Sequence, residues 1–300
     1  MPRKLLLLLL YLICQAGLCA EVSVGDAPHR GTLYRVRYHG ISSYLFGTIH
    51  VGKDSFFPLE PEVTRALARA KNLVIELDIR NAAPSQLAFD KYALYRNGDS
   101  LGRHLSGATL IKMDLALDKA GISRAAVSSY KPWLVANLLV GLELTHQGFQ
   151  RSQAVEYFLL AAAGKKDRKV LELESADYQM SLFDSMNDAQ QEDYLLENLA
   201  DLADGNSLKK SQDLIDAWST ADSAKINLLL QELTTGNSVS SNFMRITLLG
   251  KRNPEMATTI ENIIKDDQVA FVGVGLLHLI GANGVPRLLM QRGYDVEKVY

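Results

Sequence analysis

The segment Leu73-Val74-Ile75-Glu76-Leu77 is a continuous apolar run broken by a single carboxylate. Such a run is typical of a central strand that is buried on both faces. A helix is expected just before it, because Pro61 suits a first helical turn and Val63, Leu67 and Ala70 follow at helical spacing. This order predicts an α/β unit around the segment.

Further strand patterns lie nearer the two ends of the chain. Residues 32–38 alternate between apolar and polar side chains, and an apolar stretch resumes at 43–46 after His39-Gly40, so we expect a β-hairpin. Other short strands are predicted at 169–173, 269–274 and 294–299, with a short helix at 284–292.

Two long segments, 83–165 and 176–266, have helical patterns, with a break expected in the second at Pro254. Trp133–Leu144 is apolar nearly all round and predicts a buried helix of a bundle. Glu143 and His146 cut it well short of the roughly 20 residues that a membrane span needs. We therefore expect an α/β (α+β) fold, in which a small split β-sheet built from both chain ends carries two long helical insertions. Residues 21–300 would form one unit.

The first twenty residues are typical of a secretory signal peptide. Arg3-Lys4 precedes the apolar run 5–14, and small residues lead to Ala20. This pattern predicts export, to the periplasm or the outside, with no stable membrane span after cleavage. An uncleaved segment would instead anchor the chain to the membrane.

Composition excludes several classes of function. The chain has 300 residues with 32 Lys+Arg and 34 Asp+Glu, so its charge of −2 argues against a nucleic-acid binder. Both cysteines, Cys14 and Cys19, lie in the signal-like segment. A mature chain would therefore have no disulfide, no thiolate metal site and no cysteine nucleophile. Any metal would have to be held by histidine and carboxylate.

Two matching motifs carry the candidate chemistry. Gly47-Thr48-Ile49-His50 and Gly275-Leu276-Leu277-His278 each place a glycine at a strand end and a histidine three residues later. A glycine lets the backbone turn there without a Cβ penalty, and the carboxyl edge of a sheet is where α/β proteins put their sites. Glu76 and Glu174 also follow strands and are expected at that edge, whereas Glu172 has no independent mark of function.

These features resemble the TraB/PrgY/GumN family, which includes the Tiki proteases. The segments that carry the resemblance span most of the chain: Leu45–Gly52, residues 73–78, Lys131-Pro132-Trp133, Leu173-Glu174 with Gln179, Arg252-Asn253, and Phe271–Val299. The resemblance implies a metal-dependent or His/Glu-based hydrolase fold, related to the erythromycin esterases and the haem-binding ChaN-like proteins.

The chain departs from the family pattern at two places. The second motif usually reads Gly-Ala-Gly-His, but two leucines precede His278 here. Gln153-Ala154-Val155-Glu156 stands where the family often has a Gly-Val-Asp segment.

Our first hypothesis is a secreted metal-dependent peptidase or related amide hydrolase. His50 and His278 would be nitrogen ligands and Glu76 or Glu174 the oxygen ligand of zinc, manganese or cobalt. The remaining glutamate would take a proton from water, and Arg252 would either stabilise the oxyanion or form a structural salt bridge.

Two alternatives stay open. The protein could bind a peptide, haem or another small molecule at the same cleft without turnover. It could also be a metal-free esterase that uses His50 as general base with Glu76 orienting it. Neither the substrate nor the oligomeric state follows from the sequence.

Overall fold

The computed structural model describes residues 29–300 except 167, 267 and 268, so the signal-like segment 1–20 lies outside the described residues. In the described part, six strands form one mixed sheet with the order β4-β3-β5-β2-β1-β6. The strands are β1 (Leu33–Tyr38), β2 (Ile41–Thr48), β3 (Asn72–Ile75), β4 (Lys169–Glu172), β5 (Ala270–Gly275) and β6 (Asp295–Lys298).

The sheet joins the two ends of the chain, as the sequence predicts. The expected hairpin is confirmed, because β1 and β2 pair antiparallel from Leu33 opposite Phe46 to Tyr38 opposite Ile41. Strand β5, from near the carboxyl terminus, lies between β2 and β3 and is parallel to both. Strand β4 extends the parallel part, and β6 pairs antiparallel with β1.

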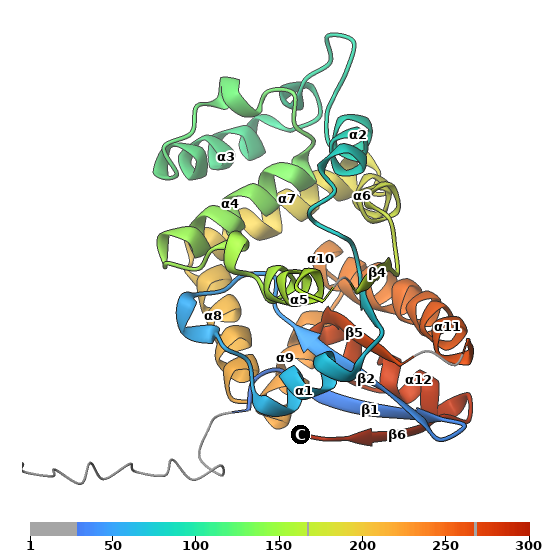
Figure 1. The fold of residues 1–300 in the computed structure, drawn as a ribbon. Coiled ribbons are helices and arrows are strands. Elements are labelled where there is room, and N and C mark those ends of the chain that lie inside the picture. The colour runs from blue at the N-terminus through green and yellow to red at the C-terminus, as the bar shows by residue number, and fades with distance from the viewer. Residues whose placement is uncertain (1–28, 167, 267–268) are drawn as a thin grey trace, which may run out of the picture.

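Helices fill the connections between these strands (Figure 1). They are α1 (Pro61–Arg69), α2 (Ala82–Tyr92), α3 (Gly107–Lys119), α4 (Pro132–His146), α5 (Val155–Gly164), α6 (Ala176–Asp184), α7 (Asp188–Ala203), α8 (Asn206–Ser219), α9 (Ser223–Thr234), α10 (Val239–Asn242), α11 (Arg252–Lys265) and α12 (Val285–Gln291). The two predicted helical insertions correspond to α2–α5 and α6–α11.

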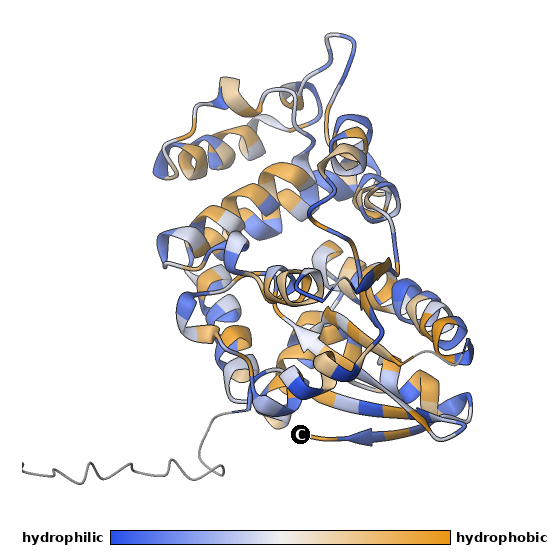
Figure 2. Cartoon of the chain, in the orientation of Figure 1, coloured by the Kyte–Doolittle hydropathy of each residue, from blue (hydrophilic) through white to orange (hydrophobic). Residues whose placement is uncertain are grey.

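The central strands are covered on both faces. Every residue of β3 and β5 is buried, which explains why these strands read as continuous apolar runs. Helix α5 contacts β3 and β4, and α11 contacts β5. Figure 1 shows α1 and α5 on one side of the sheet with α11 and α12 on the other, and Figure 2 shows the apolar residues concentrated on the strands and the helix faces that meet them.

A second layer of helices stands over one edge of the sheet, where α2, α3, α4, α6 and α7 gather (Figure 1). The apolar helix α4 packs against α7 and buries Trp133, Val135, Ala136 and Leu139. No helix in the described part of the chain is long and apolar enough to cross a membrane. The packing of α4 against α7 agrees with the predicted buried helix of a bundle.

The predicted break at Pro254 is wrong. A π-helix over Phe243–Lys251 leads directly into α11, and Pro254 lies in the first turn of that helix. Proline has no N–H to donate within a helix. Here it lies three residues after the end of the π-helix, where the hydrogen bonding changes to the α-helical pattern. Single-turn or short π-helical segments are frequent at functional sites, and this one borders the site described next.

Candidate functional site

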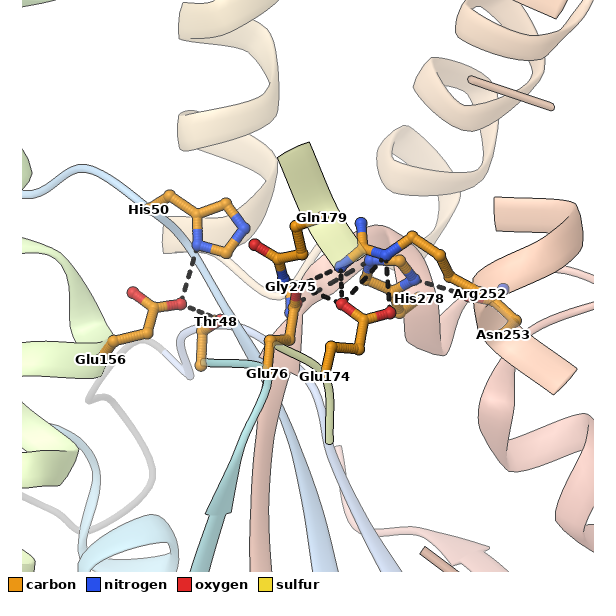
Figure 3. A network of polar contacts seen from close by, with 10 residues as sticks. All are labelled: Thr48, His50, Glu76, Glu156, Glu174, Gln179, Arg252, Asn253, Gly275 and His278. Carbon is orange, nitrogen blue, oxygen red and sulfur yellow. Dashed lines mark hydrogen bonds and ion pairs between the residues drawn. The ribbon is translucent and has the colours of Figure 1, made fainter. Parts of the chain in front are cut away.

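The carboxyl ends of the four parallel strands bring the predicted site residues to one edge of the sheet. His50, Glu76, Glu174 and His278 follow β2, β3, β4 and β5, and Arg252 reaches the same place from the start of α11 (Figure 3). The backbone pairing continues past β3 and β4, because the N–H of Glu174 donates to the carbonyl of Glu76 at 3.0 Å. This contact holds the two glutamates side by side.

Arg252 forms a buried ion pair with both of these glutamates. Its Nη2 donates to Glu76 Oε2 at 2.5 Å, and its Nε and Nη2 donate to Glu174 at 2.9 and 2.8 Å. The Arg252, Glu76 and Glu174 side chains are only 10%, 11% and 4% exposed. Burial alone would lower the pKa of Arg252, but the two carboxylates outweigh it and raise that pKa above its usual range. Gln179 completes the cluster by donating to Glu174 at 2.9 Å.

Glu76 occupies the centre of the cluster. Its Oε1 accepts the Gly275 N–H at 2.6 Å and lies 3.8 Å from Nε2 of His278. Burial opposes ionisation of Glu76, but His278, Arg252, His50 and the Gly275 N–H together lower its pKa to about 2. The carboxylate is therefore ionised throughout the neutral range.

His278 is held in one tautomer by Asn253. Asn253 Nδ2 donates to the carbonyl of Asn283 at 2.8 Å, which turns its Oδ1 toward His278 Nδ1 at 2.5 Å. The Nδ1 atom must then carry the hydrogen, and Nε2 carries the lone pair that faces Glu76. Burial lowers the pKa of His278 to about 4, so the imidazole is neutral at pH 7.

His50 has an acidic partner that sequence reasoning missed. Its Nδ1 lies 2.9 Å from Oε1 of Glu156, and Thr48 Oγ1 donates to the same oxygen at 2.5 Å. The His50 side chain is 63% accessible, whereas Glu156 is buried. The charge of Glu156 raises the pKa of His50 to about 9.

Two sequence signals could have identified these supporting residues. Glu156 is a lone carboxylate in the apolar helix Val155–Gly164, and it lies in the segment that departs from the family pattern. Asn253 stands beside Arg252 in the pair that carries the family resemblance. Neither signal says which histidine the residue would contact.

Both motif glycines are needed for space rather than for an unusual backbone angle, since neither has a positive φ. A Cβ on Gly275 would lie 3.1 Å from His50 Nε2, 3.2 Å from Glu76 Oε1 and 3.5 Å from His278 Cδ2. A Cβ on Gly47 would lie 2.8 Å from Cδ1 of Leu276. The two histidines and Glu76 therefore surround one small space above Gly275.

This donor set matches the chemistry of a divalent metal but is more open than a formed metal site. In the described residues, no group of three or more His, Cys, Asp or Glu side chains has the arrangement of a bound metal centre. Both imidazoles nevertheless have Nδ1 engaged by a second residue, which is the support that metal-binding histidines usually have. By the chemistry of its donors, two imidazoles and a carboxylate, the set suits a divalent metal.

A cavity of about 270 Å³ opens beside this cluster and is lined by His50, Arg252, Gly275 and His278. A larger cavity of about 780 Å³ lies between α3, α4, α7 and α8, and none of the predicted site residues lines it. Of these two cavities, the smaller is the one that gives a ligand access to the two histidines and Arg252.

The fold and the site define a mixed α/β protein whose two Gly-x-x-His motifs meet a glutamate–arginine cluster at the carboxyl edge of the sheet. The model of the TraB/PrgY/GumN family matches residues 32–298. The chain belongs to this family.

Relatives among known proteins are distant. The uncharacterized protein YbaP of Shigella flexneri is 24% identical over 252 residues, which cover 82% of this chain and 87% of YbaP. YbaP of Escherichia coli K12 is 24% identical over 251 residues, with the same shares of the two chains. An uncharacterized protein of Treponema pallidum is 24% identical over 194 residues, or 62% of this chain and 56% of the relative. No solved structure matches the chain.

Proposed function

We propose that the protein is a metal-dependent hydrolase of peptide or related amide bonds, in which His50, His278 and Glu76 hold a divalent zinc, manganese or cobalt ion. The observation that carries this proposal is the pairing of both histidines with a supporting residue on Nδ1. That pairing leaves each Nε2 beside the space above Gly275, next to Glu76 Oε1.

The charge of the cluster also supports a cation. Glu76 and Glu174 pair with the guanidinium of Arg252, and Glu156 pairs with His50, so the three carboxylates and one guanidinium have a formal charge of −2 when both imidazoles are neutral. Charges of one sign are costly to bury together unless a counter-charge joins them. One divalent ion would balance the cluster. In its absence, protonation of His50 supplies part of the compensation, consistent with its raised pKa.

When bound, the metal would lower the pKa of a water molecule toward about 7 and polarise the amide carbonyl. The residues of the chain prepare the site for this chemistry. Asn253 and Glu156 fix the ring orientation of His278 and His50, and the Gly275 N–H fixes Glu76. Because the pKa of Glu76 is about 2, its oxygen is available as a ligand at any pH near neutrality.

Arg252 and Glu174 have separate assignments in this proposal. Both oxygens of Glu174 accept N–H groups from Arg252, and its side chain is almost fully buried, so we assign it to positioning Arg252 rather than to accepting a proton. The ion pairs engage Nε and Nη2 of Arg252, whereas Nη1 has no marked contact in Figure 3. Because Arg252 also lines the cavity, Nη1 is the donor we assign to the developing oxyanion.

Elemental analysis of the purified protein tests the proposal directly. We expect about one equivalent of zinc, manganese or cobalt, lost on chelation and absent from His50→Ala, His278→Ala and Glu76→Gln. His146→Ala is the matched control, because His146 lies at the end of α4 and lines only the larger cavity. Metal-free protein that still hydrolyses peptides would overturn the assignment, and iron-porphyrin absorbance would favour haem binding instead.

A metal-free hydrolase is the second candidate, and the His50–Glu156 pair is the observation that favours it. The partner of His50 is Glu156 rather than Glu76, and its carboxylate keeps the imidazole protonated at neutral pH. Nε2 of His50 would then act as a general acid toward the leaving group. Hydrolysis without bound metal, lost in Glu156→Gln, would support this candidate.

We also propose that the protein is exported, on the basis of the signal-like residues 1–20. Expression of the full chain followed by amino-terminal sequencing of the exported fraction tests this. We expect a start near Glu21, and a chain that still begins at Met1 in the membrane fraction would contradict cleavage.

A further inference from the structure

The cavity beside the site has two kinds of lining residue. His50, Arg252 and His278 belong to the polar cluster, whereas most of the others are apolar and include Phe183, Met244, Leu248 and Leu277. We call this apolar part of the lining the apolar wall. No carboxylate or lysine lines this cavity in the described part of the chain. A cationic substrate group placed in this cavity would lose its hydration without gaining a carboxylate partner.

The apolar wall comes from both parts of the fold. Phe183 belongs to α6 and is fixed by stacking on Trp133, with ring centroids 4.9 Å apart, and Leu248 belongs to the π-helix Phe243–Lys251. Leu276 and Leu277 come from the turn that follows β5 and precedes His278. The helical insertions and the strand end that carries the chemistry therefore shape this wall together.

The two leucines of the turn have different environments. Leu276 is 4% exposed and fits over the end of β2, where Gly47 has no Cβ to obstruct it. Leu277 is half-buried and lines the cavity immediately before His278. Truncation of Leu277 therefore changes the cavity with less effect on the core than truncation of Leu276.

The size of the cavity limits what it can accept. Its volume of about 270 Å³ lies just below the range of roughly 300–1,000 Å³ that is usual for sites of drug-sized ligands. It can admit one side chain together with the bond next to it, but not a folded segment.

We infer that this apolar wall is the specificity pocket of the site, which selects a leucine-sized aliphatic side chain next to the bond that is cleaved, with Leu277 setting its size. The inference rests on the proposed hydrolase function, because that function identifies the bond. The pocket itself consists of residues of this chain and is present without a metal. Its selectivity can therefore be measured by binding alone.

The test uses metal-free protein and four acetylated, amidated peptides, Gly-Gly-Xaa-Gly-Gly, with Xaa as Leu, Phe, Ala or Lys. Dissociation constants are measured by NMR titration. We expect the Leu peptide to bind at least tenfold more tightly than the Lys peptide, in line with the discrimination that apolar pockets achieve. Leu277→Ala should shift the preference from Leu toward Phe by at least fivefold, and Leu277→Phe should weaken binding of the Leu peptide at least tenfold.

Leu288→Ala is the matched control. It is an equal truncation of a half-buried leucine on α12 that does not line the cavity, and it should keep the wild-type order of affinities. Melting temperatures show whether each variant is folded. If Leu277→Ala does not fold, the result for Leu277→Phe decides the test.

The inference is overturned if no peptide binds saturably, if the Lys peptide binds as well as the Leu peptide, or if both Leu277 variants keep the wild-type ratios. Failure of the proposed function has a different signature. Protein that never binds metal but still prefers the Leu peptide would refute the metal-dependent hydrolase and leave the pocket intact.

Discussion

The Oδ1 atom of Asn253 lies 2.5 Å from Nδ1 of His278, and a second hydrogen bond from Asn253 to the carbonyl of Asn283 fixes the direction of that contact. One amide therefore determines which nitrogen of the buried imidazole bears the hydrogen. The lone pair is directed to Nε2, on the side of Glu76.

Removal of this amide should weaken metal binding. We expect Asn253→Ala to lower the affinity for zinc about 10- to 100-fold, because His278 loses the support of its tautomer and ring orientation. Competition with a chelator measures the affinity. Asn198→Ala is the control, since Asn198 makes a similar hydrogen bond to the carbonyl of Tyr194 on α7. An unchanged affinity in folded Asn253→Ala would show that Asn253 does not support His278 as a ligand.

The affinity for metal should rise with pH because a proton competes for His50. Its pKa is raised to about 9, so Nε2 carries a proton at neutral pH that the metal must displace. We expect the zinc affinity to rise by up to about tenfold per pH unit between pH 7 and 9. Zinc titrations at fixed free-metal concentration give this slope.

Glu156→Gln should remove most of that dependence. A neutral amide no longer stabilises the imidazolium, so the pKa of His50 should fall toward about 6.5 and the slope above pH 7 should flatten. Glu62→Gln, which changes a partly exposed carboxylate of α1 far from His50 in the sequence, should keep the wild-type slope. Equal slopes in the wild type and Glu156→Gln would refute a role for Glu156 in the titration.

The metal-free protein should lose stability in weak acid because of His278. Burial lowers the pKa of His278 to about 4 in the folded state, whereas the unfolded chain titrates near 6.5. Between these values the unfolded state binds a proton that the folded state does not. The titration of His278 therefore leaves the free energy of unfolding at its full value above pH 6.5. As pH falls from 6.5 toward 4, that free energy decreases by up to about 1.4 kcal/mol per pH unit.

Urea unfolding of the wild type and His278→Gln at pH 5 and 6.5 checks this expectation. The glutamine can still donate a hydrogen bond but does not titrate, so its stability should fall less across that interval. If the two proteins lose the same stability, other groups must account for the acid sensitivity.

The sequence predicted the sheet more completely than the site. Strands β3 and β5 are buried on both faces, so their apolar runs stand out, and parallel strands place Glu76, Glu174 and the two histidines at one edge. The contacts among these residues depend on tertiary structure. Glu156 reaches His50 from a helix 106 residues later in the chain, and no local pattern encodes that distance.

The role of Arg252 could not be decided from sequence for a similar reason. Salt bridges and oxyanion stabilisation use the same side chain, and only the partners distinguish them. The structure shows two carboxylates on Nε and Nη2 of Arg252, which establishes the ion pair. These contacts do not use Nη1, so the second role can be tested separately.

Substitution of Arg252 should separate these two roles. Arg252→Met leaves Glu76 and Glu174 buried without their common partner, so we expect a loss of about 3–5 kcal/mol in the free energy of unfolding. Arg252→Met combined with Glu174→Gln should recover part of that loss, because one uncompensated charge is removed. Arg65→Met, which removes an exposed ion pair with Glu62, should change stability little.

Arg252→Lys completes the test, because it keeps the charge but lacks the planar fork that contacts both glutamates. If Arg252 serves only as an ion pair, the folded Lys variant should retain turnover of peptide substrates. If Nη1 also stabilises the oxyanion, kcat should fall about 10²- to 10³-fold with little change in KM, since that contact forms only in the transition state. Unchanged kcat in a folded Arg252→Lys protein would therefore remove Arg252 from the reaction and leave it a structural role.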